Sequence, residues 1–231
     1  ICTPTLIAAD MLRQILPRLQ DGPGSPVITD VASVKGNLRD AAVEVMGRMP
    51  EQLVLAHPIA GSERSGVEAS DAKLFVNHRV ILTPVEGNDP AAIELLRAMW
   101  ASTGAEVLDM AVAEHDAVLA ATSHLPHVLA YALVDALAQS SASEDIFRFA
   151  AGGFRDFTRI ASSDPTMWRD IALANKGALL DSIDLFSEHL GRLREAVASE
   201  DADQLFATFV RAKQARDEFA AILAQRTQPK T

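Results

Sequence analysis

The sequence predicts an α/β segment up to about residue 110, followed by an all-helical segment. Short apolar runs alternate with helical patterns in the first segment, and the strand signals end after about residue 111. Apolar residues then recur in steps of three and four. Short strands that alternate with helices indicate a mostly parallel sheet, and the later spacing indicates packed helices.

Each element of the first segment has its own signal. Apolar runs predict strands over 27–31, from 53, from 79 and over 106–110. Helical spacing predicts helices over 6–20 and 37–48, and the tract DGPGSP at 21–26 breaks the chain between them. Asp89 followed by Pro90 predicts the start of a third helix, and Gly104 predicts its end.

The second segment reads as helices with apolar faces. Residues 112–139 are apolar on all faces, which predicts a helix buried in a bundle and kinked at Pro126. Asp164 followed by Pro165 starts another helix. Two apolar seams come next, formed by Leu179, Ile183, Phe186, Leu190, Leu193 and Val197, and by Leu205, Phe209, Phe219 and Leu223. Packing within the chain and a homodimer interface explain these seams equally well.

Composition limits the classes of function. The chain has 231 residues, a formal net charge of -10 and 48% hydrophobic residues. The negative charge disfavours binding to nucleic acid or to an anionic membrane surface. A single cysteine, Cys2, excludes an intrachain disulfide and fits a reducing cytoplasm. We recognise no signal peptide and no apolar run of membrane-spanning length, and the start at Ile1 suggests a fragment without its natural beginning.

Polar side chains follow two of the predicted strands. His57 comes after an apolar strand and before a loop with two glycines, and ligands of open α/β sheets bind beyond the carboxyl ends of the strands. An imidazole there is a candidate proton acceptor, although a strand-end histidine bonded to backbone is the simpler alternative. Asp30, Ser33 and Lys35 follow the strand at 27–31. Ser33 as a helix cap with a solvated Lys35 is equally plausible.

Two further clusters lie in the helical segment. His124 and His127 share a helical face, but without a carboxylate or cysteine in register we favour one substrate-facing and one structural histidine over a metal site. His115, beside Asp116, is expected to orient the junction between the two segments. Arg155, Asp156 and Arg159 follow Gly152 and Gly153 among apolar residues. We expect partly buried arginines that bind an anionic substrate, with surface pairing to Asp156 or Asp164 as the alternative.

Taken together, the motifs resemble the prephenate dehydrogenase family, which includes arogenate dehydrogenases. The matching stretches cover essentially the whole chain: CTPT at 2–5, VITDVASVK at 27–35, HPIAGSERSG at 57–66, SHLPH at 123–127 and GGFRDFTRIASSDPTMW at 152–168. The resemblance implies the C-terminal portion of a Rossmann-type nicotinamide-binding domain over 1–110 and a helical substrate and dimerisation domain over 111–231.

The resemblance also implies an activity. Family members use NAD or NADP to oxidise and decarboxylate prephenate to 4-hydroxyphenylpyruvate, or act on arogenate, in tyrosine biosynthesis. A cytoplasmic homodimer without a metal is implied. Catalytic roles fall to His57 and Ser33, substrate binding to His124, Arg159, Gly152 and Glu63, and cofactor binding to Thr3, Pro4, Asp30 and Ser33.

One departure keeps alternatives open. No GxGxxG pattern follows a strand in this chain, and about 60 residues of a mononucleotide-binding unit are missing by the usual size of such units. A non-catalytic dimerisation module therefore remains an alternative. So do a β-hydroxyacid-type dehydrogenase that uses Lys176 and a histidine-based metallohydrolase.

Overall fold

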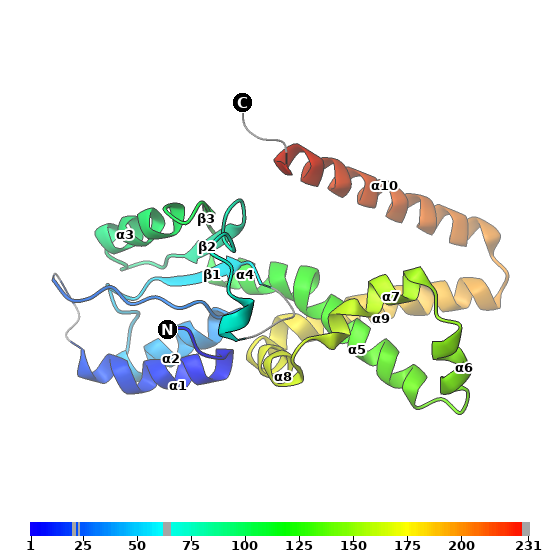
Figure 1. Cartoon of the computed structure of the whole chain (residues 1–231), viewed down its shortest axis with the longest axis horizontal. Helices are drawn as coiled ribbons and strands as arrows, with labels where there is room; N and C mark the ends of the chain where they lie inside the picture. The colour runs from blue at the N-terminus through cyan, green and yellow to red at the C-terminus, as the bar shows by residue number, and fades with distance from the viewer. Residues whose placement is uncertain (20–21, 23, 62–65, 228–231) are drawn as a thin grey trace. The chain divides into compact units, whose positions relative to one another are not determined.

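The computed structural model describes residues 1–19, 22, 24–61 and 66–227 (Figure 1). It separates into two compact units. Unit 1 is Ile1–Ser182 and unit 2 is Ile183–Thr231. Unit 1 holds the α/β segment together with most of the helices that follow it. A division near residue 110 therefore stays a prediction.

Three strands form the sheet of unit 1. They are β1 (Leu55–Ile59), β2 (Arg79–Thr83) and β3 (Glu106–Asp109), in the order β1-β2-β3. The β2–β3 pair is parallel because α3 (Pro90–Ala101) forms the crossover between these strands. The β1–β2 pair is antiparallel. The sheet is thus mixed rather than mostly parallel, and the described part of the β1–β2 connection contains only η2 (Val67–Ala69).

The strand predicted over 27–31 is reduced to an isolated parallel bridge between Ile28 and Leu53. Beyond this bridge the backbone bonds elsewhere: Val31 N donates to Ile1 O over 3.2 Å. The carboxylate of Asp30 points into the protein, where it accepts bonds from the backbone of Ala32 and Ala56. The apolar run is therefore buried, as expected, without continuing a ladder.

Helices α1 (Thr5–Ile15), with the short η1 (Leu16–Arg18), and α2 (Gly36–Met46) pack together on the core. Apolar side chains of both helices join Leu53 and Leu55 in one buried cluster. A second cluster surrounds Trp100 of α3, next to Val80 and Leu82 of β2. The predicted cap of α3 is confirmed, because the Asp89 carboxylate accepts from Ala91 N over 2.9 Å.

The long apolar helix is interrupted at its middle. It consists of α4 (Val112–Leu119), a π-helical turn η3 (Ala120–His124) and α5 (Leu125–Ala138). Pro126 lacks the N–H that would continue the α-helical ladder, and the wider turn just before it accommodates that loss. The predicted disruption therefore takes the form of a π-turn.

The prediction that this helix is buried on all sides was wrong. Within α5, all of which the structure describes, Ala130 is the one buried residue. By length and composition, Val112–Ala138 could even cross a membrane, with a mean hydropathy of 1.4 and 22% of the window buried. The expectation that no apolar run approaches that length was thus also wrong. Yet α4 carries His115 and Asp116, both buried inside unit 1. The absence of membrane or nucleic-acid binding stays a prediction.

The remaining helices of unit 1 are short. They are α6 (Ser143–Arg148), α7 (Gly152–Thr158), η4 (Arg159–Ser162), α8 (Pro165–Ala174) and the first turns of α9 (Lys176–Ala198). Asp164 caps α8 by accepting from Met167 N over 2.7 Å, as predicted. Helix α8 packs against α1, and η4 and α7 pack against α5.

Unit 2 consists of the rest of α9 and of α10 (Ala202–Thr227). Its apolar seams are largely uncovered within the unit. The exposed members are Leu190, Val197, Phe209, Phe219 and Leu223, and the neighbouring Leu185 and Phe206 are exposed as well. Leu179, at the start of the same α9 seam, is by contrast buried in unit 1. Packing within unit 2 therefore does not account for these side chains.

Candidate active site

A buried ion pair organises the loop that leads into α2. The Lys35 ammonium donates to the Asp30 carboxylate and, over 2.7 Å, to Ala56 O of β1. Both side chains are completely buried. Burial lowers the pKa of Lys35, although the neighbouring Asp30 charge opposes that shift. The alternative of a solvated Lys35 was wrong. The bond to β1 that buries this amine depends on the fold and cannot be read from the sequence alone.

Asp116 of α4 joins this loop to the helices. Its carboxylate accepts from Lys35 N over 2.9 Å and from Gly36 N over 2.7 Å, at the N-terminus of α2. Burial would raise the pKa of Asp116, but these bonds and the one from His115 lower it overall. A negative group is favoured at a helix N-terminus. A Cβ at Gly36 would lie 2.8 Å from Asp116 Oδ2, so this close approach requires glycine.

A row of hydrogen bonds links this carboxylate to two histidines. His115 Nδ1 lies 2.8 Å from Asp116 Oδ1, and His115 Nε2 lies 2.9 Å from Nδ1 of His57 in β1. His115 is fully buried and His57 is 8% exposed. Burial lowers the pKa of His57 well below 6.5, and the positive charge of Lys35 adds to the effect. His57 is therefore neutral at physiological pH, which is the form a proton acceptor requires.

His124, the last residue of the π-turn, is linked to Asp116 through Asn175. The side-chain amide of Asn175, at the end of α8, donates to the Asp116 carbonyl over 2.8 Å and lies 3.1 Å from His124 Nδ1. Because that amide donates, His124 Nδ1 accepts and Nε2 carries the proton. His124 Nε2 is buried and has no hydrogen-bond partner among the described residues. Burial lowers the pKa of His124 to about 4, so its ring is neutral.

His127 has a different role from His124. Its ring stacks on Trp168 of α8 with centroids 3.5 Å apart, and its Nδ1 donates to Ser123 O over 2.9 Å. Burial lowers the pKa of His127 as well. The indole Nε1 of Trp168 is buried without a partner among the described residues. His127 thus packs against α8.

The arginine cluster lies on the surface of unit 1. Arg159 begins η4 and is exposed, and the Arg155 side chain is 80% exposed. Arg155 pairs with Asp156 over 3.1 Å, as the surface alternative proposed. The expectation of partly buried arginines was therefore wrong: Phe157, one of the apolar neighbours invoked, is itself 49% exposed. Gly152, the first residue of α7, is exposed too.

The other predicted site residues lie in the first segment. Ser33 is half-buried in the loop after Asp30 and does not cap α2, whose N-cap is Lys35. Thr3 is half-buried, and its hydroxyl has no partner among the described residues; Pro4 is exposed and precedes α1. Asp30 holds internal partners, which gives its carboxylate a structural role. Glu63 lies outside the described residues.

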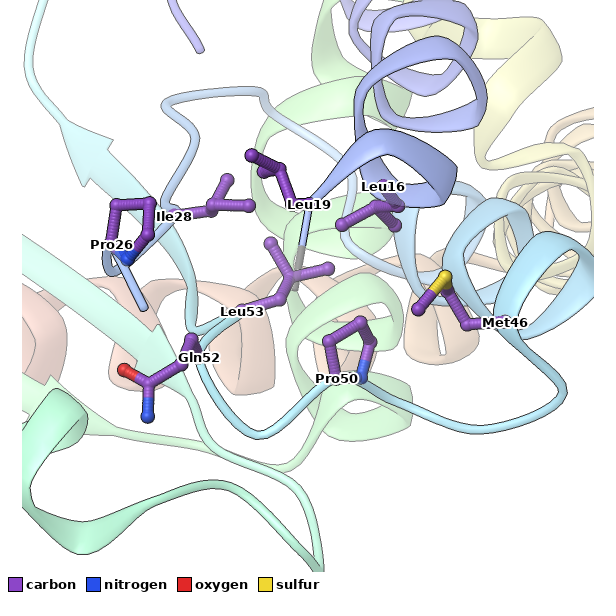
Figure 2. Close-up of a pocket in the computed structure, with 8 residues that line it drawn as sticks. All are labelled: Leu16, Leu19, Pro26, Ile28, Met46, Pro50, Gln52 and Leu53. Atoms are coloured by element: carbon purple, nitrogen blue, oxygen red, sulfur yellow. The ribbon is translucent and has the colours of Figure 1, made fainter. Parts of the chain in front are cut away.

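No group of three metal-binding side chains is found in the part of the chain that the structure describes. A small apolar pocket lies elsewhere in unit 1, beside the Ile28–Leu53 bridge (Figure 2). Its lining comes from η1 and Leu19 just after it, from the end of α2, from the segment with Pro26 and Ile28, and from the loop before β1. The residues of η1, α2 and that loop include Leu16, Met46, Pro50 and Gln52. None of the clustered histidines lines it.

Two family models match the chain. A family model described as the prephenate dehydrogenase nucleotide-binding domain matches residues 1–109. A second, described as the prephenate dehydrogenase dimerization domain, matches residues 111–211.

The chain belongs to the prephenate dehydrogenase family.

Relatives within the prephenate dehydrogenase family resemble the chain closely. It is 42% identical over 222 residues to the prephenate dehydrogenase of Bacillus subtilis, covering 92% of this chain and 59% of that protein. It is 36% identical over 219 residues to the cyclohexadienyl dehydrogenase of Zymomonas mobilis, covering 94% of this chain and 73% of that protein. The crystal structure of prephenate dehydrogenase from A. aeolicus, in complex with hydroxyphenyl propionate and NAD+, matches with a TM-score of 0.84 and 37% identity, covering 94% of this chain and 74% of that one.

Three features of this site in the prephenate dehydrogenase family member were not predicted from the sequence. Lys35 is a buried partner of Asp30, Asn175 supports His124, and His115 joins His57 to Asp116. The adjacent His115 and Asp116 on an apolar helix were the available signal for the last of these. A histidine and an aspartate on the buried face of such a helix need polar partners, and here those partners are His57 and the start of α2.

Proposed function

We propose that the full-length protein uses NAD or NADP to oxidise and decarboxylate prephenate to 4-hydroxyphenylpyruvate. The observation that carries this proposal is a buried, neutral His57 in the middle of β1, rather than after the strand as expected, bonded through His115 to the Asp116 carboxylate. Such an arrangement suits a base that accepts a hydroxyl proton. Membership of the family supports the reaction class. The substrate and cofactor remain proposals, since the chain spans 59% of the Bacillus subtilis relative.

The bound dinucleotide would supply a hydride acceptor for the carbinol carbon of the substrate. The residues present fit the nicotinamide end of such a cofactor: Thr3 offers a buried hydroxyl that lacks a partner among the described residues. Pro4 directly follows Thr3, and Ser33 lies in the loop before α2. A glycine-rich turn for the pyrophosphate is not found in this sequence, so that contact is not assigned to it.

In this proposal His57 accepts the proton of the substrate hydroxyl as the carbinol carbon is oxidised. A positioned general base contributes about 10²–10⁴ to a rate. Loss of carbon dioxide leaves its bonding electrons in the ring, which becomes a phenol when the oxygen regains a proton. The protein's task is thus to orient the substrate and to hold one proton.

Cationic and neutral donors would hold the two carboxylates. Arg159, which directly follows α7 (Gly152–Thr158), presents a planar guanidinium suited to bidentate carboxylate binding. His124 offers a buried Nε2–H donor. A donor whose hydrogen bond is unmet in the free protein gains most from a ligand acceptor. Glu63, which follows His57 in the sequence, is proposed to line the entrance.

The test of the proposed function is steady-state kinetics on the full-length protein with prephenate. His57→Asn should lower kcat by about 10²-fold or more with a modest change in KM. Arg159→Ala should instead raise KM, because it removes a binding contact. Arg155→Ala is the matched control, since Arg155 pairs with Asp156 on the surface. Unchanged turnover in His57→Asn would remove His57 from the mechanism.

The principal alternative substrate is arogenate, which carries an amino group where prephenate has a keto group. The Zymomonas mobilis relative is a cyclohexadienyl dehydrogenase, a name that does not restrict the substrate to one of the two. The ratio of kcat/KM for the two substrates decides between them. A non-catalytic module is the second alternative, and it predicts no change in cofactor fluorescence on titration.

We also propose that the protein is a cytoplasmic homodimer. The dimerization-domain match and the exposed apolar side chains of unit 2 support the dimer. Exposed aromatic rings such as Phe206 and Phe209 are costly in water and are typical of interfaces. Phe209→Glu should shift the sedimentation coefficient toward that of a monomer. Asp217→Lys, at an exposed ion pair on the same helix, is the control.

A further inference from the structure

The row formed by Asp116, His115 and His57 determines where the protons of the two imidazoles lie. Hydrogen bonds lower the pKa of Asp116, so its carboxylate is ionised and only accepts. His115 Nδ1 therefore donates to Asp116 Oδ1 across 2.8 Å. In neutral His115 the other nitrogen, Nε2, is an acceptor. His57 Nδ1 must then donate to it across 2.9 Å, which leaves His57 Nε2 with a lone pair.

We propose that Asp116 and His115 are positioning residues that hold His57 in the tautomer with its proton on Nδ1, so that Nε2 faces the substrate hydroxyl as a base. This inference rests on the proposed function of His57. It assigns to His115 and Asp116 a role in catalysis, in addition to joining the two segments of the chain.

The hydrogen bonds around Asp116 fix the orientation of its carboxylate, and so the position of the His115 ring bonded to it. Its two carboxylate oxygens accept from the backbone of Lys35 and Gly36, so the group cannot rotate without losing bonds at the start of α2. His115 is 0% exposed, so water does not compete for either of its nitrogens. Among the described residues, His115 is the recorded hydrogen-bond partner of the His57 ring. The tautomer of His57 is thus set by one neighbour.

Three substitutions separate this role from packing. His115→Phe keeps a buried aromatic ring but offers no acceptor to His57 Nδ1. His115→Gln can place its amide oxygen near the former Nε2 and so restore an acceptor. Asp116→Asn removes the charge that fixes the His115 tautomer, and it also weakens the contact with α2. His78→Gln, at an exposed histidine outside the site, is the control for a general effect of histidine loss.

The first readout is the tautomer itself, measured on the ¹⁵N-labelled full-length protein by long-range ¹H–¹⁵N correlation. His57 should show a protonated Nδ1 and an unprotonated Nε2 in the native protein and in His115→Gln. In Asp116→Asn and His115→Phe a population with protonated Nε2 should appear. A native His57 that carries its proton on Nε2, or a tautomer that none of these changes moves, overturns the inference whatever the activity is.

The second readout is turnover. His115→Phe and Asp116→Asn should lower kcat by at least about tenfold while KM stays within about twofold, and His115→Gln should recover most of the lost kcat. Equal loss in the Phe and Gln variants would show a packing role and overturn the proposal. If the tautomer shifts as stated while kcat stays unchanged, then His57 is not the base, and the proposed function of His57 fails instead.

Discussion

Removal of the buried Lys35 amine is a sharp test of the loop that carries the site. In Lys35→Met the Asp30 carboxylate keeps two backbone donors, from Ala32 and Ala56, but loses its only recorded charged partner among the described residues. Both side chains are 0% exposed, so water cannot replace the lost ammonium. Breaking a buried pair in this way costs about 3–5 kcal/mol of unfolding free energy.

The assay is thermal and urea unfolding of the full-length variant, followed by circular dichroism. A loss of about 3–5 kcal/mol corresponds to a fall in Tm of about 6–20 °C for a chain of this size. Lys213→Met is the matched control, because Lys213 forms an exposed pair with Asp217 on α10. That pair is expected to contribute about 0.3–0.5 kcal/mol at most.

A double variant separates charge from shape. Asp30→Asn combined with Lys35→Met leaves no uncompensated charge, so it should be more stable than Lys35→Met alone. A Lys35→Met protein as stable as Lys213→Met would refute the reasoning, because it would mean that the Asp30 charge is not buried. A double variant less stable than the single one would show that lost hydrogen bonds, and not the charge, dominate.

Two further predictions concern the same region. Gly36→Ala should cost about 1–3 kcal/mol of unfolding free energy, because the new Cβ would lie 2.8 Å from Asp116 Oδ2 and displace its hydrogen bonds. In the control Gly177→Ala, in α9, the new Cβ meets no atom within 4 Å, so this change should be neutral or stabilising. Equal effects of the two changes in urea unfolding would contradict the close contact at Gly36. Stability should also fall as the pH drops from about 6.5 toward 4, because the folded pKa of His124 is about 4 and the unfolded chain binds a proton first. That difference amounts to about 3 kcal/mol, and His124→Gln should flatten this part of the curve of unfolding free energy against pH; an unchanged slope would contradict the burial of His124.

Local signals predicted the elements of the fold well. The caps of α3 and α8, at Asp89 and Asp164, were readable because capping chemistry acts within three residues. The antiparallel β1–β2 pair was not predicted, because strand direction depends on how the connection returns. The exposure of α5 was not predicted either. An apolar sequence shows that a surface needs a partner, but not whether the same chain provides it.

The site was predictable in part and for a similar reason. Strand-end and loop position drew attention to His57, and helical spacing drew attention to His124. The partners that set their protonation, His115 and Asn175, lie 58 and 51 residues away in the sequence. Only the folded chain brings them together. The burial of Arg155 and Arg159 was predicted wrongly, because apolar residues that are neighbours in sequence bury a side chain only if they also pack against it in the fold.

The most direct test of the central claim is a crystal structure of the full-length protein with NAD+ and hydroxyphenyl propionate. If His57 is the base, its Nε2 should lie about 2.6–3.2 Å from the phenol oxygen of the ligand, with His115 still bonded to Nδ1. A ligand oxygen that contacts another side chain, with the His57 Nε2 turned away from it, would contradict the claim.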